Sequence, residues 1–186
     1  MKRIFDLFLS ATSLTLLAIP MLMIAVAVRL TSRGPALYWS HRVGKNNKIF
    51  KMPKFRSMLL DTPTVATHLL DHPDVYLSPI GGFLRLSSLD ELPQLISVLK
   101  GDMSFVGPRP ALFNQEDLIV LRTEKGISKL LPGITGWAQV NGRDELSISE
   151  KVSLDLEYLN HKSFWFDMKI LFITFSKILK CDGVSH

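Results

Sequence analysis

The sequence predicts an α+β protein that is mainly helical, with a membrane helix over residues 1–32 and a membrane-associated domain over 33–186. Three observations predict this class. Residues 4–28 are mostly apolar and Asp6 is the only charged residue among them, which indicates a membrane segment. Two short alternating segments on either side of residues 44–47 are typical of a β-hairpin. The later apolar stretches fit helices, several of which we expect to be amphipathic and to lie in the membrane interface around a small core.

The membrane segment is long enough to span a bilayer, since twenty-odd residues in a helix cross a hydrocarbon core of about 30 Å. However, Pro20 lies in its interior, where a proline costs a helix about 3 kcal/mol. A cleaved signal peptide is disfavoured because no Ala-x-Ala-like site follows. A spanning helix has its Lys/Arg bias on one side, whereas this segment has basic residues on both: Lys2, Arg3, Arg29 and Arg33. We therefore expect a re-entrant helix that bends near Ile19-Pro20 and returns to the cytoplasmic face, with a spanning helix as the alternative.

The charge is unevenly distributed along the chain. Residues 1–60 hold ten Lys/Arg and one acid, a net +9, while residues 61–186 hold twelve and sixteen, a net −4. A basic region beside an apolar segment attracts anionic phospholipids, by about 1 kcal/mol per basic residue near the surface. Nucleic acid is not the expected partner, because no helix-turn-helix, zinc-finger or aromatic RNA-binding pattern is present. The single cysteine, Cys181, excludes an internal disulfide and a cysteine-cluster metal site.

The predicted elements after the membrane segment begin with two strands, over 36–43 and 48–56, and Pro53 should keep the second at a sheet edge. Residues 59–80 contain three prolines and are interpreted as a surface loop. Ser87 or Ser88 can cap a helix that runs through Leu99 and stops at Lys100-Gly101. Further predictions are helices over 112–124 and 149–161, loops over 132–137 and 141–143, and an interfacial helix over 164–179 with Trp165 and the phenylalanines facing inward.

Two adjacent carboxylates, Asp90 and Glu91, lie at the start of the helix predicted to run through Leu99. Ser88 and Glu91 have the spacing of a capping box, which would explain the glutamate but does not require Asp90. An aspartate near a helix N-terminus is held ionised by the helix dipole and is a candidate nucleophile toward phosphorus. Neighbouring side chains in a helix point about 100° apart, so one carboxylate can attack while the other holds a metal.

Basic residues that could bind phosphate complete the candidate site. Arg109 is flanked by Pro108 and Pro110, so it has little freedom to lose when it grips a phosphate, although a solvated turn arginine would look the same. The others are Lys54 and Arg56, with headgroup anchoring as the alternative, Arg85, with a local ion pair as the alternative, and Arg143. A zinc site at His68 and His72 is disfavoured because no glutamate follows the first histidine and Pro73 ends any helix.

Several motifs occur in an order that is specific to one family. The segments are Lys-Arg-Ile-Phe-Asp (2–6), Lys-Phe-Arg-Ser-Met (54–58), Leu-Ser-Ser-Leu-Asp-Glu-Leu-Pro-Gln-Leu (86–95), Leu-Lys-Gly-Asp-Met-Ser-Phe-Val-Gly-Pro-Arg-Pro (99–110) and Pro-Gly-Ile-Thr-Gly-Trp-Ala-Gln-Val-Asn-Gly-Arg (132–143). Over nearly its whole length the chain resembles the monotopic bacterial phosphoglycosyl transferases of the bacterial sugar transferase family, in their minimal catalytic form. One departure is Ile19 before Pro20, where family members often have serine.

The resemblance implies transfer of a sugar phosphate from a UDP-sugar to undecaprenyl phosphate at the cytoplasmic face of the bacterial inner membrane, with release of UMP, as the first membrane step of surface glycan assembly. It implies that Asp90 is the nucleophile of a ping-pong reaction with a covalent phosphosugar intermediate, and that Glu91 binds Mg²⁺. The other positions that match the family are phosphate-binding Lys54, Arg85, Arg109 and Arg143, together with Pro20, Pro110 and Asp167.

Three alternatives remain open at this stage. The first is a non-enzymatic membrane adaptor in which Ser88 and Glu91 only cap a helix. The second is an enzyme that works through a ternary complex without a covalent step. The third concerns the apolar C-terminal run, which could serve a homodimer as well as a lipid surface. No motif identifies the donor sugar, for which we expect an N-acetylated amino sugar.

Overall fold

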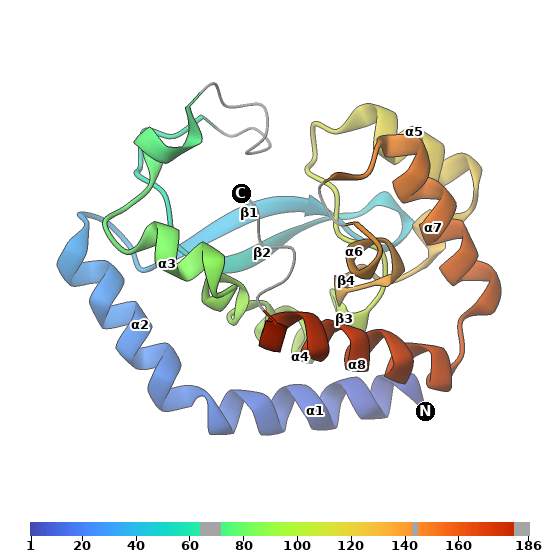
Figure 1. Ribbon diagram of the computed structural model, residues 1–186, viewed down its shortest axis with the longest axis horizontal. Helices are drawn as coiled ribbons and strands as arrows, with labels where there is room; N and C mark the ends of the chain where they lie inside the picture. Colours follow the sequence, from blue (N-terminus) through green and yellow to red (C-terminus); the bar gives the residue numbers. More distant parts are fainter. Residues whose placement is uncertain (64–71, 143–144, 181–186) are drawn as a thin grey trace.

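The structure is a computed structural model that describes residues 1–63, 72–142 and 145–180. The first two helices, α1 (Lys2–Leu16) and α2 (Ala18–Thr31), form a bent arm along one side of the molecule (Figure 1). The remaining elements are gathered on the inner side of this bend, around the hairpin formed by β1 (Leu37–Val43) and β2 (Ile49–Phe55). The predicted mainly helical α+β class is confirmed.

The N-terminal helices are bent by 62° at Leu17, two residues before the predicted Ile19-Pro20 break. Pro20 lies in the first turn of α2, where its ring would clash with the carbonyl of Leu16 in a continuous helix. The interruption therefore falls before the proline rather than at it. Among the described residues no single helix is long and apolar enough to cross a membrane, whereas α1 and α2 meet that requirement together as a bent pair.

The predicted hairpin is confirmed. Its strands pair antiparallel from Leu37 opposite Phe55 to Val43 opposite Ile49. Pro53 is tolerated because the sheet has two strands and both are edges. The connection is a tight 3-10 turn, η1 (Lys45–Asn47), whose two asparagines adopt the left-handed conformation that asparagine tolerates well.

The predicted helix from Ser88 through Leu99 is wrong, because the chain forms two short pieces there: the 3-10 turn η4 (Leu89–Glu91) and α4 (Gln94–Lys100), which ends at Gly101 as predicted. Pro93 is the physical reason, since its ring excludes a regular helical turn over the preceding four residues. Another short helix, α3 (Gly81–Leu86), precedes these two pieces. A further 3-10 turn, η3 (Pro73–Tyr76), lies in the predicted 59–80 loop.

The prediction of a loop over 132–137 is also wrong. Strand β4 (Gly133–Thr135) pairs in parallel with β3 (Ser104–Val106), and the helical turn α6 (Trp137–Val140) follows. Both strands are only three residues long, so they show no alternating pattern. The close approach requires glycine at position 133, because a Cβ there would collide with the backbone nitrogen of Gly107.

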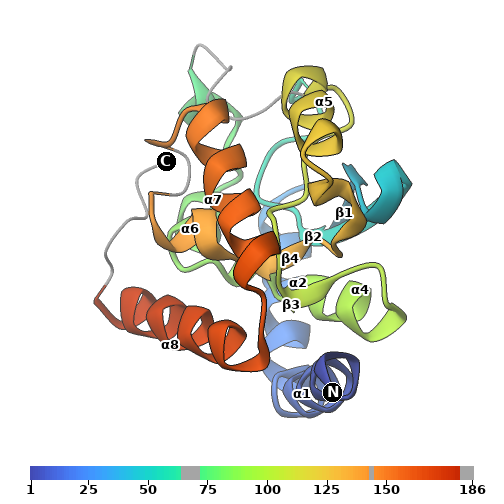
Figure 2. The same cartoon turned by 90° about the vertical axis from the view of Figure 1, so that its right-hand side faces the viewer.

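The predicted helices of the C-terminal half are present, although the first begins at Glu116 rather than at residue 112. This half comprises α5 (Glu116–Glu124), the 3-10 turn η5 (Ile127–Lys129), α7 (Ile148–His161) and α8 (Phe164–Lys180). A capping box between Ser147 and Glu150 starts α7. Both views place α8 and α1 along the same edge of the molecule (Figures 1 and 2). Trp165, Phe172 and Phe175 on α8 are more than half exposed and face away from the protein core, whereas Phe166 packs against it.

Candidate active site

Asp90 and Glu91 lie in η4, where they meet side chains from two distant segments. Lys54 of β2 donates from Nζ to Glu91 Oε1 at 2.7 Å, and the same nitrogen is 3.7 Å from Asp90 Oδ2. Arg109 donates from Nη2 to Glu91 Oε1 at 3.3 Å. Asp90 is 7% exposed, and the Lys54 and Glu91 side chains are 16% and 14% exposed. The site is therefore a mostly buried pair of carboxylates with a lysine between them.

The capping-box interpretation of Ser88 and Glu91 is wrong. Ser88 adopts a left-handed conformation with φ of 55°, and its side chain caps no backbone amide. The Glu91 carboxylate accepts hydrogen bonds from Lys54 and Arg109 instead of the backbone at the turn. The left-handed serine turns the chain so that the two carboxylates face β2. These acids are therefore part of the charged site and not a helix terminus.

The electrostatics of Asp90 differ from the expectation of an aspartate held ionised by a helix dipole. Burial raises its pKa above the ordinary value, and the neighbouring Glu91 carboxylate raises it as well. Lys54 is the strongest of the cations that oppose this, followed by Arg85 and Arg109. A three-residue turn offers almost no dipole, so these cations take its place. They stabilise the charged form that a nucleophile requires.

The predicted basic residues divide into three groups. Lys54, Arg85 and Arg109 all act on the Asp90–Glu91 pair. Arg56 does not, because it is buried and donates to Ser32 and to the carbonyl of Arg33, where it secures the end of α2. Arg143 lies outside the described residues, so its predicted role is not tested.

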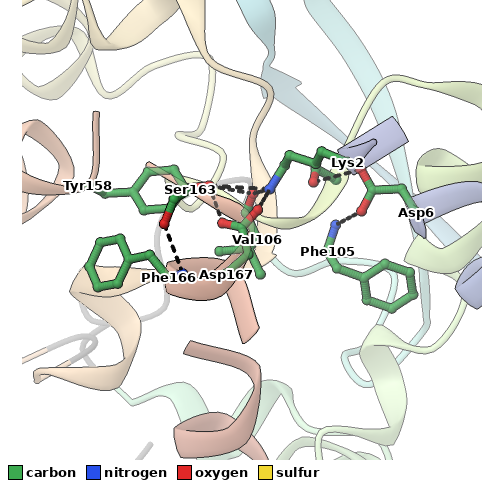
Figure 3. Close-up of polar contacts among 9 residues, drawn as sticks. Lys2, Asp6, Phe105, Val106, Tyr158, Ser163, Phe166 and Asp167 are labelled. Carbon is green, nitrogen blue, oxygen red and sulfur yellow. Dashed lines mark hydrogen bonds and ion pairs between the residues drawn. The ribbon is translucent and has the colours of Figure 1, made fainter. Parts of the chain in front are cut away.

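The structure places Asp167 in a different cluster, shown in Figure 3. Its Oδ2 pairs with Lys2 Nζ at 2.6 Å and its Oδ1 accepts from the Tyr158 hydroxyl at 2.7 Å. Lys2 also donates to the carbonyl of Val106 at 2.9 Å. Burial, and the hydrogen bond to Asp167, raise the pKa of Tyr158 far above its usual value, so the hydroxyl remains a donor.

A second polar contact from α1 reaches the same strand. Asp6 is 2% exposed; its Oδ2 accepts from Ser104 Oγ at 2.9 Å and its Oδ1 from the backbone nitrogen of Phe105 at 3.2 Å (Figure 3). Thus Lys2 and Asp6 attach the N-terminal helix to β3, which leads directly into the turn that bears Arg109. Sequence reasoning did not single out Asp6 as functional. Its position as the one acid in an apolar segment was the available signal.

The carboxylate pair Asp90 and Glu91 fits a Mg²⁺ site that is completed by substrate phosphates and water. Among the described residues no three His, Cys, Asp or Glu side chains are grouped as a metal site. However, Mg²⁺ is commonly held by one or two carboxylates together with substrate phosphates and water, and Asp90 and Glu91 supply that number.

Of the two histidines of the disfavoured zinc site, His72 is exposed and His68 lies outside the described residues.

Comparison with known proteins identifies the family. Residues 1–181 match the bacterial sugar transferases. The chain belongs to that family. It is 40% identical over its full length to an uncharacterized Bacillus subtilis sugar transferase, EpsL, of which it covers 91%. Over 95% of its length it is 42% identical to a UDP-glucose:undecaprenyl-phosphate glucose-1-phosphate transferase of Escherichia coli, and over 98% it is 37% identical to an undecaprenyl-phosphate galactose phosphotransferase of Salmonella typhimurium.

The last two relatives are much longer proteins. The chain spans 40% of the length of the E. coli transferase and 41% of the Salmonella one. Membership of the bacterial sugar transferase family makes the protein a transferase, and the adaptor alternative is thereby set aside.

Proposed function

We propose that the protein transfers a sugar 1-phosphate from a UDP-sugar to undecaprenyl phosphate and releases UMP. The observation that carries the proposal is the buried Asp90 carboxylate, placed beside Glu91 and surrounded by Lys54, Arg85 and Arg109. Phosphoryl transfer depends mainly on positioning and charge neutralisation, which this arrangement offers. The name of the E. coli relative supports a UDP-sugar donor, and the names of the E. coli and Salmonella relatives both support undecaprenyl phosphate as the acceptor.

The proposed reaction has two displacements at one phosphorus atom. A carboxylate oxygen of Asp90 attacks the sugar-bearing phosphorus of the donor, and the bond from that phosphorus to the UMP oxygen breaks. The product is a phosphosugar esterified to Asp90. An oxygen of undecaprenyl phosphate then attacks the same phosphorus, which forms the lipid diphosphate sugar and returns the Asp90 carboxylate. Arg109 and Lys54 neutralise charge on the transferring group.

We propose that Glu91, with Asp90 beside it, holds Mg²⁺ through carboxylate oxygens. When bound, the ion neutralises negative charge on phosphoryl oxygens. Lys54 and Arg109 already contact Glu91 Oε1, so these cations fix the orientation of the carboxylate that faces the donor. Arg143 remains a proposed phosphate contact, on the strength of the motif in which it occurs.

We further propose that α1 and α2 form a re-entrant membrane helix at the cytoplasmic face of the bacterial inner membrane. The bent apolar pair supports this, as do the basic residues at both of its ends. The exposed aromatic side chains of α8 lie along the same edge of the molecule and would meet the lipid interface, where anionic headgroups complement the basic flanks. A homodimer through α8 is the competing use of that surface.

The function is tested by UMP release from a panel of UDP-sugars, with the purified protein and Mg²⁺ in lipid nanodiscs prepared with and without undecaprenyl phosphate. We expect an N-acetylated amino sugar, whereas the names of the E. coli and Salmonella relatives give glucose and galactose, so both classes belong in the panel. We expect donor alone to release about one equivalent of UMP per protein, and donor with acceptor to give continuous release. Absence of release with every donor would contradict the proposal. Release that requires the acceptor would support the ternary-complex alternative.

The membrane topology gives a separate prediction. In a chain with Cys181 replaced by serine, we expect a cysteine at exposed Lys48 and a tag fused before Met1 to be labelled only after the inner membrane is permeabilised. Both ends of the bent helix pair then lie on the cytoplasmic side. Labelling of the tag alone in intact spheroplasts would mean that the segment spans the membrane.

A further inference from the structure

The turn that bears Arg109 is held from behind by a buried ion pair. Arg122 of α5 donates from Nη1 to the backbone carbonyl of Arg109 at 2.7 Å. The Nε and Nη2 atoms of Arg122 donate to Asp155 Oδ2 at 2.9 Å and 2.6 Å. Asp155, on α7, has 1% of its side chain exposed, and Arg122 has 11%. A buried charged pair formed by α5 and α7 thus reaches the peptide group of Arg109.

Burial of this ion pair costs desolvation free energy, because both charged groups are removed from water. Burial raises the pKa of Asp155, and Arg122 is the main group that opposes the rise. Buried ion pairs can often be replaced by apolar side chains without loss of stability, so stability alone does not explain this one. What a guanidinium offers is geometry: its planar fork fixes two donors on the carboxylate and directs a third along a set line. Here the third donor points at the carbonyl of Arg109.

The space beside the turn on the α5 side is not completely filled by side chains. A small pocket adjoins the turn, and the residues that line it include Pro108, Arg109 and Pro110 together with Ile119, Arg122 and Ile127. Arg122 bridges the space between α5 and the turn. Hydrogen bonds therefore fix a segment that side-chain packing leaves partly unsupported.

The next carbonyl along the turn is held in the same way. Arg42 of β1 donates from Nη1 to the carbonyl of Pro110 at 3.1 Å and from Nε to Ser40 Oγ at 3.0 Å. On the other side of the turn, the backbone nitrogen of Gly107 donates to the carbonyl of Thr135 at 2.9 Å. The peptide groups around Arg109 are thereby fixed by three separate elements, and Arg122 holds the one that belongs to Arg109 itself.

We propose that Arg122, oriented by Asp155, is a positioning residue for Arg109. By fixing the carbonyl of residue 109 it sets the direction in which the Arg109 guanidinium extends toward Glu91 and the diphosphate of the donor. The inference rests on the proposed function, because it assigns Arg109 to phosphate. Arg122 touches no reacting atom in this scheme and acts only through the backbone of the turn.

A double-mutant cycle tests this dependence. Arg122→Met is expected to lower kcat/KM for the UDP-sugar by roughly tenfold or more, because small misplacements of a binding group have large effects on rate. Arg122→Lys should recover part of the loss, since its ammonium can still donate to the carbonyl. In an Arg109→Ala background, Arg122→Met should cause no further loss, because the group it positions is gone. Lys125→Met, exposed just after the same helix, is the matched control.

Each outcome decides between explanations. Equal losses in the presence and absence of Arg109 would show that Arg122 acts on the fold in general, and would overturn the inference. Wild-type rates for Arg122→Met would overturn it as well. Failure of the wild-type protein to release UMP from any donor would instead contradict the proposed function. If Arg122→Met does not fold, as judged by thermal unfolding, the cycle is run with Arg122→Lys, which keeps a positive charge opposite Asp155.

Discussion

Replacement of Asp90 by asparagine is expected to lower sugar-phosphate transfer by on the order of 10³-fold or more, while the protein still folds and binds membranes. The amide of asparagine is nearly isosteric with the carboxylate but cannot form the phosphosugar ester. The release of UMP with donor alone should disappear together with turnover. Asp102→Asn, at an exposed position just after α4, is the matched control and should keep wild-type rates.

The stability of the Asp90→Asn variant follows from the raised pKa of Asp90. Between the ordinary aspartate pKa and the raised one, the folded protein binds more protons at this site than the unfolded chain does. Ionisation of Asp90 therefore opposes folding as the pH rises through that window, and asparagine removes this opposition. We expect a Tm at neutral pH that is equal to or above that of the wild type, by thermal unfolding in detergent. A large fall in Tm would mean that lost activity reflects misfolding.

The titration of Asp90 should also appear in the pH profile of wild-type activity. Because the attacking oxygen must be ionised, kcat/KM for the donor should fall with decreasing pH, with a midpoint above the usual aspartate range. Full activity in Asp90→Asn at any pH would contradict the assignment of Asp90 as the nucleophile.

Adjacent residues made the centre of the site predictable, and Lys54, Arg85 and Arg109 were predicted as site residues, whereas their contacts with the two acids were not predicted. Asp90 and Glu91 are neighbours in the sequence, and a pair of carboxylates near a constrained arginine is a recognisable pattern. The contact of Glu91 with Lys54 joins residues 37 positions apart, and only the path of β2 past η4 brings them together. Arg122 and Asp155 occur singly within helices, 33 positions apart, so no local pattern identifies them.

The fold errors have local physical causes. The helix predicted from Ser88 overlooked Pro93, although a proline five residues after a proposed cap should have ended it. Strands β3 and β4 escaped prediction because three residues are too few to show alternation, and their pairing depends on glycines that allow close backbone approach. In contrast, the hairpin and the long helices α7 and α8 were predicted correctly, because each is long enough for its pattern to be distinct.

Replacement of Lys54 by methionine is expected to lower the free energy of unfolding by about 3 kcal/mol at neutral pH, because it leaves two mostly buried carboxylates without the cation between them. Arg109 remains on Glu91, and Arg85 still acts on Asp90, so the loss is partial. The destabilisation should shrink as the pH falls and the carboxylates become protonated. Chemical denaturation at neutral and acidic pH measures both values. Lys51→Met, exposed on the same strand, should have little effect.

Activity measurements should distinguish the effect of Lys54 on the pKa of Asp90 from its effect on stability. Lys54 lowers the pKa of Asp90 more than any other cation does, so its replacement raises that pKa further. The acid limb of the pH profile should therefore move to higher pH, and kcat/KM should fall by on the order of 10²-fold. The double variant Lys54→Met/Glu91→Gln removes one charge of each sign and should regain most of the lost stability. It should stay inactive, because the carboxylate proposed to hold Mg²⁺ is absent. Recovery of transfer in that double variant would show that Glu91 serves only to balance the lysine.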